Sequence, residues 1–192
     1  MRLVLASASP RRAELLRTAG FQCDVMPSEV DETMDPEETP DGYVRRVAQQ
    51  KAEAVAPSVP GRPILGADTV VVIDNHVLGK PDDEEDVRRM LRLLSGREHV
   101  VMTGVCLIPG HEGSPRKQIV VARTLVEFAP ISDSEIRWYI DSGEPWDKAG
   151  AYAVQGLASR FVTRIEGSYS NVVGLPVADV YAMCTRAGIL VS

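Results

Sequence analysis

The chain has 192 residues, of which 44% are apolar and 25% are charged, the proportions of an ordinary globular protein. Its formal charge is −6, since 27 acidic residues outnumber 21 lysines and arginines. This acidity disfavours non-specific nucleic-acid binding, which depends on basic groups, although a small phosphorylated ligand needs only a local positive pocket. The length predicts one domain over residues 1–192, built of two lobes.

The cysteines and the apolar runs indicate where the protein resides. Cys23, Cys106 and Cys184 lie too far apart for a C-x-x-C or metal-ligand pattern, so we expect free thiols in a reducing compartment. The N-terminal apolar run is too short for a signal peptide, and no stretch approaches the ~20 residues of a membrane span. These features predict a cytoplasmic protein that does not contact membranes.

Strand and helix patterns alternate in the first half of the chain. An apolar run over residues 2–6 predicts a strand, and Ser9 followed by Pro10 is a typical helix start, with Gly20 as its end. The helical stripe of this segment comprises Ala13, Leu15, Leu16 and Ala19. Next come a strand over residues 22–26, an acidic loop over 28–38, a helix from 39 to 57 and a strand over 64–74. The buried stripe of the second helix comprises Tyr43, Val44, Val47, Lys51 and Val55.

The second half continues the alternation. Residues 82–94 form a strongly amphipathic helix with acids in its first turn, and its buried face comprises Val87, Met90, Leu91 and Leu94. Strands over 100–108 and 119–128 are predicted antiparallel partners, joined by a polar turn over 109–117. A capping box at Ser132 and Glu135 begins a helix to about residue 141, before a strand over 161–165 and a helix over 176–187. The pattern predicts an α/β protein with a mixed, twisted sheet and flanking helices.

The first candidate site lies between the first strand and the first helix. A helix start offers unpaired backbone N–H groups and the positive end of the helix dipole. The segment 7–12 adds the hydroxyls of Ser7 and Ser9 and the guanidinium groups of Arg11 and Arg12. These groups predict a phosphate cradle, although a Ser-Pro helix start followed by arginines is also an ordinary sequence.

Carboxylates form the second candidate site. Asp31 and Glu32 lie in the acidic loop, and adjacent residues of an extended segment point opposite ways, so only one of them is expected to face a site. Asp68 lies within a Val/Ile-rich strand, where a charge is costly to bury unless it is paired or bound to a ligand. Surface acids are common in loops, and for Asp68 alone a structural role and a functional role are equally favoured.

Lysines and a polar, glycine-rich segment complete the candidates. Lys51 falls near the buried stripe of its helix, and Lys80 lies in a tight Gly-Lys-Pro turn, although either could simply be solvated. Near a phosphate cradle they would neutralise triphosphate charge. The segments 146–156 and 167–176 are rich in glycine and polar side chains, and Gln155 offers an amide that could read the edge of a base. Three histidines, His76, His99 and His111, show no ligand or triad spacing, and we interpret His76 and His111 as turn or surface residues.

Taken in order, these segments resemble the Maf family from one end of the chain to the other. The matching motifs are SASPRR at 7–12, DE at 31–32, KA at 51–52, GADTVV at 66–71, KP at 80–81, SG at 95–96 with His99, TG at 103–104, DKAGAY at 147–152 with QG at 155–156, and GSY at 167–169 continuing to Pro176. Each motif alone is weak, but the ordered set is highly specific.

The resemblance carries expectations about fold and activity. Members are similar to inosine-triphosphatase-like (Maf/Ham) enzymes, with an elongated α/β fold, a central nucleotide cleft between two lobes and usually a homodimer. They hydrolyse a nucleoside triphosphate to the monophosphate and pyrophosphate with a divalent cation, Mg²⁺ or Mn²⁺. Oxygen ligands suit such hard ions. The expected substrates are dTTP and UTP, and the expected role is the clearing of nucleotide pools.

The resemblance also implies roles for individual residues. Asp68 matches the proton acceptor, and Glu32, Lys51 and Lys80 match other residues that activity requires. The positions that set base preference match Arg11, Thr69 and Gln155. Our mechanistic hypothesis is that Glu32 and Asp68 hold the metal, Asp68 activates water, and the two lysines stabilise the departing pyrophosphate, while the segment 7–12 binds the phosphates.

Two alternatives remain open. The chain could hydrolyse 7-methyl-GTP or another modified nucleotide, although that branch tends to carry Ser-Asp-Gln where this chain has Ala67-Asp68-Thr69. It could also be a non-catalytic nucleotide-binding regulator of septum formation and cell division. The intact set of acids and lysines favours catalysis.

Overall fold

The computed structural model describes residues 2–110 and 117–189. Most of the turn predicted over residues 109–117, with His111 in it, lies outside the described residues. The chain forms two compact units. The first holds residues up to 68, 103–122 and from 174 onward, and the second holds residues 69–102 and 123–173.

One mixed sheet joins the strands of the described chain, in the order β2-β1-β3-β5-β6-β7, with β4 paired to β3. The strands are β1 (Leu3–Ala6), β2 (Cys23–Val25), β3 (Ile64–Ile73), β4 (His76–Leu78), β5 (Glu98–Ile108), β6 (Gln118–Phe128) and β7 (Val162–Glu166). The pairs β1–β2 and β1–β3 are parallel, whereas β3–β4 and β6–β7 are antiparallel. The α/β class with a mixed sheet and flanking helices is therefore confirmed.

The predicted helices are present, together with shorter ones. The α-helices are α1 (Pro10–Thr18), α2 (Pro40–Val55), α3 (Glu84–Leu94), α4 (Asp133–Asp141), α5 (Tyr169–Val173) and α6 (Val177–Arg186), and the 3₁₀ turns are η1 (Ala56–Ser58), η2 (Ala149–Ala151) and η3 (Leu157–Phe161). Helix α4 begins with the predicted capping box, in which Ser132 and Glu135 each bond to the backbone of the other. In the described part of the chain, no helix has the length and apolarity that a membrane span requires.

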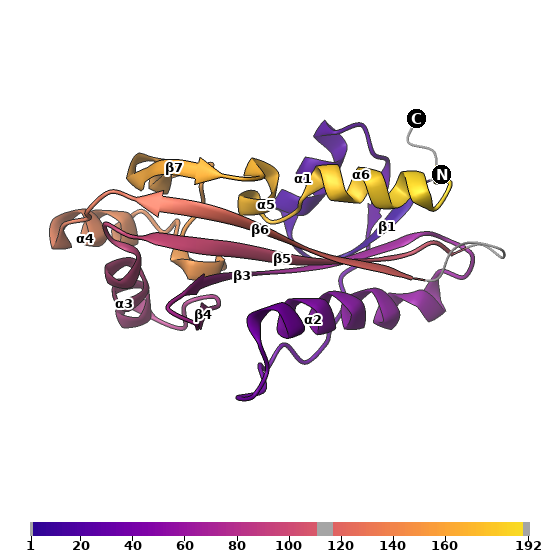
Figure 1. The fold of residues 1–192 in the computed structure, drawn as a ribbon, viewed down its shortest axis with the longest axis horizontal. Coiled ribbons are helices and arrows are strands. Elements are labelled where there is room, and N and C mark those ends of the chain that lie inside the picture. The colour runs from indigo at the N-terminus through magenta and orange to yellow at the C-terminus, as the bar shows by residue number, and fades with distance from the viewer. Residues whose placement is uncertain (1, 111–116, 190–192) are drawn as a thin grey trace. The chain divides into compact units, whose positions relative to one another are not determined.

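In the first unit, strand β1 is covered on both faces. All four of its residues are buried, and alternate side chains point to opposite faces of the sheet. Leu3 and Leu5 join a core cluster with α1 and α6, whereas Val4 and Ala6 join one with α2. Figure 1 shows α1 and α6 on one side of β1 and α2 on the other. Burial on both faces explains why these strands read as apolar runs.

Helix α2 lies very close to β3 at Gly66. A Cβ atom at Gly66 would lie 2.2 Å from the carbonyl oxygen of Ala48 and 2.8 Å from the backbone nitrogen of Ala52. The predicted stripe of α2, from Tyr43 to Val55 with Lys51, is buried throughout. Because Lys51 precedes Ala52, this approach brings the lysine to the part of β3 that holds Asp68.

The second unit contains a hairpin that the sequence analysis missed. Strand β3 turns into β4 through Asp74 and Asn75, which both adopt positive φ values of 48° and 63°. Two successive residues of this kind form the tight turn that suits the twist of a hairpin. Strand β4 has only three residues, too few for a periodic pattern, and it contains the exposed His76. The amphipathic face predicted for α3 is buried as expected.

The predicted stripe of α1 is only partly right. Ala13 and Leu16 are buried and Leu15 is half-buried, but Ala19 is exposed at the C-cap of the helix. Arg12 is buried on the same helix, in a place where the pattern predicted no burial. The three cysteines are free thiols, as expected, although Cys23 is only half-buried.

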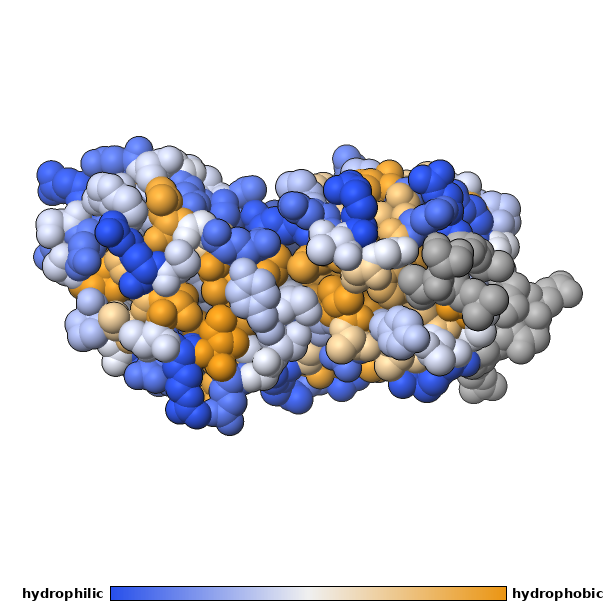
Figure 2. Space-filling view, turned by 90° about the horizontal axis from the view of Figure 1, so that it is seen from above, coloured by the Kyte–Doolittle hydropathy of each residue, from blue (hydrophilic) through white to orange (hydrophobic). Residues whose placement is uncertain are grey.

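The surface has an ordinary mixture of side chains. Figure 2 shows hydrophobic residues among hydrophilic ones on the face that it views, which is normal for a folded protein. Among the described residues, the exposed large apolar side chains are Val25, Trp138, Trp146, Leu157, Tyr169 and Tyr181.

An aromatic cluster around His99 forms part of the core of the second unit. The imidazole packs edge-on against Phe128 and Tyr152, and its Nε2 lies 2.8 Å from the Tyr152 hydroxyl oxygen. His99 is only 2% exposed. Burial lowers the pKa of His99 to about 4, because the charged form loses its hydration. The imidazole is therefore neutral in the folded protein at neutral pH.

The close approach at Gly66 yields a stability prediction. We expect Gly66→Ala to lower the free energy of unfolding by about 3 kcal/mol, because the methyl group must push α2 away from β3. Urea unfolding monitored by circular dichroism measures this loss. Gly79→Ala is the control, since a Cβ there meets none of the described atoms within 4 Å, and its effect should stay within about 0.5 kcal/mol. Equal stability of the two variants would contradict the proposed packing.

The neutral His99 yields a pH prediction. Below about pH 6.5 the unfolded chain protonates this histidine, whereas the folded protein does so only near pH 4. Stability must therefore fall as the pH drops through this window, by up to about 3 kcal/mol from this group. We expect His99→Gln to show a correspondingly shallower loss of unfolding free energy between pH 6.5 and 4. His76→Gln, at an exposed site, controls for losing a histidine, and identical slopes for His99→Gln and wild type would refute the assignment.

Candidate active site

Polar side chains contact one another at the start of the first helix. Ser9 is the N-cap of α1, and its hydroxyl accepts a hydrogen bond from the backbone of Arg12 at 3.4 Å. The buried Ser7 hydroxyl accepts from the Ser9 backbone at 3.2 Å and from Nη1 of Arg12 at 3.0 Å. Arg11 is half-buried on the same first turn. The predicted cradle residues are thus adjacent in space, and their hydroxyls are already oriented.

Arg12 is a buried cation in this cradle. Its Nε donates to the carbonyl oxygen of Gly174 at 2.9 Å, which ties the start of α1 to the segment before α6. Burial lowers the pKa of Arg12, while the negative charges of Asp68 and Glu32 oppose that effect. A guanidinium group keeps its proton under these conditions. Arg12 therefore places a permanent positive charge within electrostatic reach of both carboxylates.

Helix α2 delivers Lys51 to the carboxylates. The helix is begun by Thr39, whose hydroxyl accepts from the backbone of Gly42 at 3.2 Å. Lys51 is on its buried face and is 7% exposed. A lysine buried to this degree is expected to have ionic partners, because an isolated ammonium is costly to remove from water.

Two carboxylates share the Lys51 ammonium group. Its Nζ lies 2.8 Å from Oδ1 of Asp68 and 2.8 Å from Oε1 of Glu32. The Asp68 side chain is 9% exposed, whereas that of Glu32 is 45% exposed. One carboxylate therefore belongs to the core and the other to the surface. Asp31, the neighbour of Glu32, points its carboxylate to its own loop, where it accepts from the backbone of Thr33 at 2.8 Å.

The remaining predicted residues belong to the second unit. Thr69 follows Asp68 directly in β3 and is half-buried. Lys80 is exposed in the turn after β4, and the carbonyl oxygen of Gly79 beside it accepts from the backbone of Gly150 at 2.9 Å. The exposed Gln155 precedes η3. The structure thus brings Glu32, Lys51 and Asp68 together in the first unit. Thr69, Lys80 and Gln155 belong to the second unit.

An acid that was not predicted from the sequence, Glu144, holds the turn that follows Gln155. Glu144 accepts hydrogen bonds from the Tyr139 hydroxyl at 2.9 Å and from the backbone of Leu157 and Ala158 at 2.8 and 3.2 Å. These bonds cap the start of η3 at Leu157, two residues after Gln155. The only signal in the sequence was an acid near an aromatic residue five positions earlier, which is too common to single out.

The donor set of Glu32 and Asp68 fits a hard divalent cation. Their carboxylate oxygens converge on one positive group, and oxygen is the ligand that Mg²⁺ and Mn²⁺ prefer. Mg²⁺ is commonly held by one or two carboxylates together with substrate phosphates. Among the described residues, no group of three or more histidine, cysteine, aspartate and glutamate side chains could hold a metal ion.

The chemistry available to this cluster follows from its parts. A buried carboxylate beside a fixed ammonium group can accept a proton from water. A helix start with a buried arginine can bind phosphate oxygens. The fold and this cluster define an α/β protein whose candidate site combines two carboxylates and a buried lysine with a polar helix start that carries a buried arginine.

Comparison with known proteins identifies the family. A family model described as Maf-like protein matches residues 2–187, and the chain belongs to this family. A relative from Koribacter versatilis, named dTTP/UTP pyrophosphatase, is 54% identical over 99% of this chain and 96% of its own length. A second protein of that name, from Anaeromyxobacter dehalogenans, is 53% identical over 97% of this chain and 94% of its own.

A solved structure also resembles the chain. The Ham1 protein of Staphylococcus aureus matches with a TM-score of 0.48 and 14% identity, covering 67% of this chain and 72% of its own. A likeness at this level carries no argument about function, so the family assignment rests on the sequence matches.

The shared ammonium group leads to a prediction about stability. Replacing Lys51 by Met leaves the buried Asp68 carboxylate without its cation, which should lower the free energy of unfolding by about 3 kcal/mol. The control is Lys117→Met, because Lys117 pairs with Glu53 where both side chains are more than 40% exposed. Such surface pairs contribute at most about 1 kcal/mol. Chemical denaturation of the two variants would contradict this account if the losses were equal.

Proposed function

We propose that the protein hydrolyses nucleoside triphosphates to the monophosphate and pyrophosphate, with dTTP and UTP preferred. The observation that carries the proposal is the cluster of Glu32, Lys51 and Asp68, with the Arg12 cradle in electrostatic reach. Membership of the Maf-like family supports it, as do relatives about half identical over nearly the whole chain that are named for this activity.

In the proposed reaction, Asp68 accepts a proton from a water molecule. The water oxygen forms a bond to the α-phosphorus, and the bond from that phosphorus to the oxygen bridging the α- and β-phosphates breaks. Pyrophosphate leaves with the electron pair of the broken bond. Asp68 suits this role because the fixed ammonium of Lys51, 2.8 Å away, orients its carboxylate.

The positive groups bind and orient the triphosphate. Arg12 is held by Ser7 and by the Gly174 carbonyl oxygen, so it can present its charge with little loss of conformational freedom. The N–H groups at the start of α1 add donors for phosphate oxygens. Glu32 and Asp68 would hold a Mg²⁺ or Mn²⁺ ion, which when bound supplies Lewis-acid polarisation of the phosphate oxygens.

The residues of the second unit have proposed roles that follow the family resemblance. Lys80 would neutralise charge on the departing pyrophosphate, and Thr69 and Gln155, with Arg11 of the first unit, would set the preference for a pyrimidine base. Cytoplasmic location, homodimer formation and the clearing of nucleotide pools stay predictions.

A product assay tests the proposal. We expect purified protein with Mg²⁺ or Mn²⁺ to release pyrophosphate and the monophosphate from dTTP and UTP, faster than from CTP, GTP, ATP or 7-methyl-GTP. Asp68→Asn should lower kcat at least about 100-fold, because the proton acceptor is lost. Glu53→Gln removes an exposed acid of α2 and serves as the control.

Each contrary outcome has a defined meaning. Pyrophosphate from 7-methyl-GTP alone would replace the proposed substrate by the modified nucleotide. Nucleotide binding without turnover would favour a regulator of septum formation. Near-normal turnover by Asp68→Asn at saturating Mg²⁺ would refute the mechanism.

A further inference from the structure

The segment that carries Glu32 has no regular structure of its own. It runs from the end of β2 at Val25 to the start of α2 at Pro40, without an intervening helix or strand. Fixing a loop residue in one conformation costs entropy, on the order of 1–2 kcal/mol for each backbone. The position of Glu32 beside Lys51 must therefore depend on contacts made by the loop with the rest of the first unit.

Tyr43 makes one of these contacts, directly to the backbone of Glu32. Its hydroxyl donates to the carbonyl oxygen of Glu32 at 2.8 Å. The tyrosine is buried on the inner face of α2 and is 8% exposed. A rigid, buried side chain thus holds the backbone of the residue whose carboxylate contacts Lys51.

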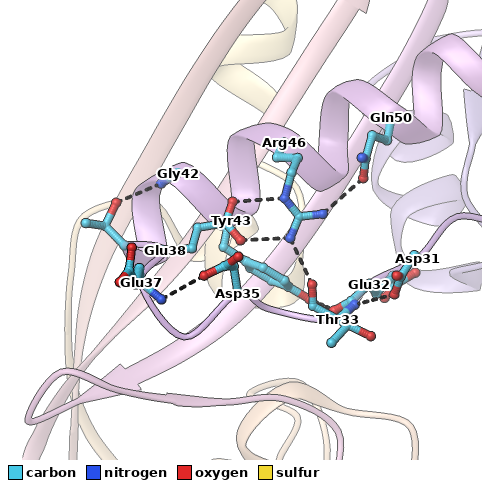
Figure 3. A network of polar contacts seen from close by, with 11 residues as sticks. Asp31, Glu32, Thr33, Asp35, Glu37, Glu38, Gly42, Tyr43, Arg46 and Gln50 are labelled. Atoms are coloured by element: carbon cyan, nitrogen blue, oxygen red, sulfur yellow. Dashed lines mark hydrogen bonds and ion pairs between the residues drawn. The ribbon is translucent and has the colours of Figure 1, made fainter.

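Arg46 makes further contacts with the loop, and all three of its guanidinium nitrogens donate hydrogen bonds. Nη2 donates to the carbonyl oxygen of Thr33 at 3.0 Å, and Nε and Nη2 donate to the Glu38 carboxylate at 2.9 and 2.8 Å. Nη1 donates to the amide oxygen of Gln50 at 3.1 Å. Figure 3 shows the guanidinium group between the loop and α2, and it also lies over the Tyr43 ring, 5.4 Å from its centre. Arg46 therefore ties the residue after Glu32 to the end of the loop.

The acids of the loop have different partners. Asp31 and Asp35 accept from the backbone of Thr33 and Glu37, at 2.8 and 2.9 Å, and so stabilise local turns. Glu38 pairs with Arg46. In this loop, Glu32 is the acid whose carboxylate contacts the buried ammonium group of Lys51.

The residues that hold the loop and the lysine that binds Glu32 all lie on α2. Tyr43, Arg46 and Gln50 are three and four residues apart, so they lie on neighbouring turns of one helical face. Lys51 is eight residues after Tyr43 and is buried on the same helix. A single helix therefore presents the ammonium group and also holds the loop whose carboxylate reaches it.

We propose that Tyr43 and Arg46 are positioning residues that hold Glu32 in the active site. This inference rests on the proposed function, because it assigns them to the same centre. Neither needs to touch the substrate. Both act by keeping the Glu32 carboxylate beside Lys51, so that the two carboxylates are arranged before a triphosphate and its metal ion bind.

Two conservative variants test the proposal. Tyr43→Phe removes only the hydroxyl, and we expect kcat/KM for dTTP to fall about fivefold to tenfold, as for the loss of one hydrogen bond. Arg46→Lys keeps the charge but loses the planar fork, and should cost about tenfold or more. Arg45→Lys is the matched control, because the exposed Arg45 pairs with Asp41 one turn earlier on α2, and this variant should change activity less than twofold.

A double-mutant cycle separates positioning from a general structural effect. If Tyr43 acts through Glu32, Tyr43→Phe should cost little further activity in a Glu32→Gln background. The half-saturating concentration of Mg²⁺ should rise in Tyr43→Phe. The same loss in both backgrounds, or normal kcat/KM in both Tyr43→Phe and Arg46→Lys, would overturn the proposal.

Hydrogen exchange gives a readout that does not depend on turnover. We expect the amides of residues 31–38 to exchange faster in Tyr43→Phe and Arg46→Lys than in wild type or Arg45→Lys. If the wild-type protein hydrolysed no nucleotide while the two variants still exchanged faster than wild type, the proposed function would be refuted and the positioning would stand. Unchanged exchange in both variants would refute the positioning, whatever the activity.

Discussion

The ammonium group of Lys51, shared by two carboxylates, is the interaction on which the candidate site depends. Three charges meet where Asp68 and Lys51 are both more than nine-tenths buried. Neither charge would be tolerated there alone, since the lost hydration would not be compensated. The pairing gives each of the two buried groups an oppositely charged partner at 2.8 Å, while Glu32 reaches the same ammonium group from the surface.

Backbone packing rather than polar contact sets the geometry of this pairing. Helix α2 can reach β3 only because Gly66 lacks a side chain, and Asp68 lies two residues further along the strand. The opposite face of β1 is packed against α1 and α6, which places the cradle of Ser7 and Arg12 in the same unit. The rigid part of the site is thus built from helices on both faces of one strand layer. The carboxylate of Glu32, by contrast, depends on a loop and on the side chains that hold it.

Local patterns predicted most of the fold because their causes are local. The capping box at Ser132 needs only residues three apart, and the stripe of α2 follows from the helical period, so both were predicted correctly. Strand β4 was missed because three residues show no period, and Ala19 was misjudged because it lies at the helix end, beyond the packed face. The burial of Arg12 did not follow from the helical stripe, because it depends on a hydrogen bond to the carbonyl oxygen of Gly174, which is distant in sequence.

By itself, the sequence determined the class of fold, the order of its main elements, the family and the residue types of the candidate site. Only the tertiary structure decided how those residues meet. It put Lys51 between Asp68 and Glu32, assigned Asp31 to a local turn instead, and revealed that Tyr43 and Arg46 hold the loop. The physical reason is that periodicity and capping depend on neighbours along the chain, whereas the compensation of buried charge depends on groups brought together by folding.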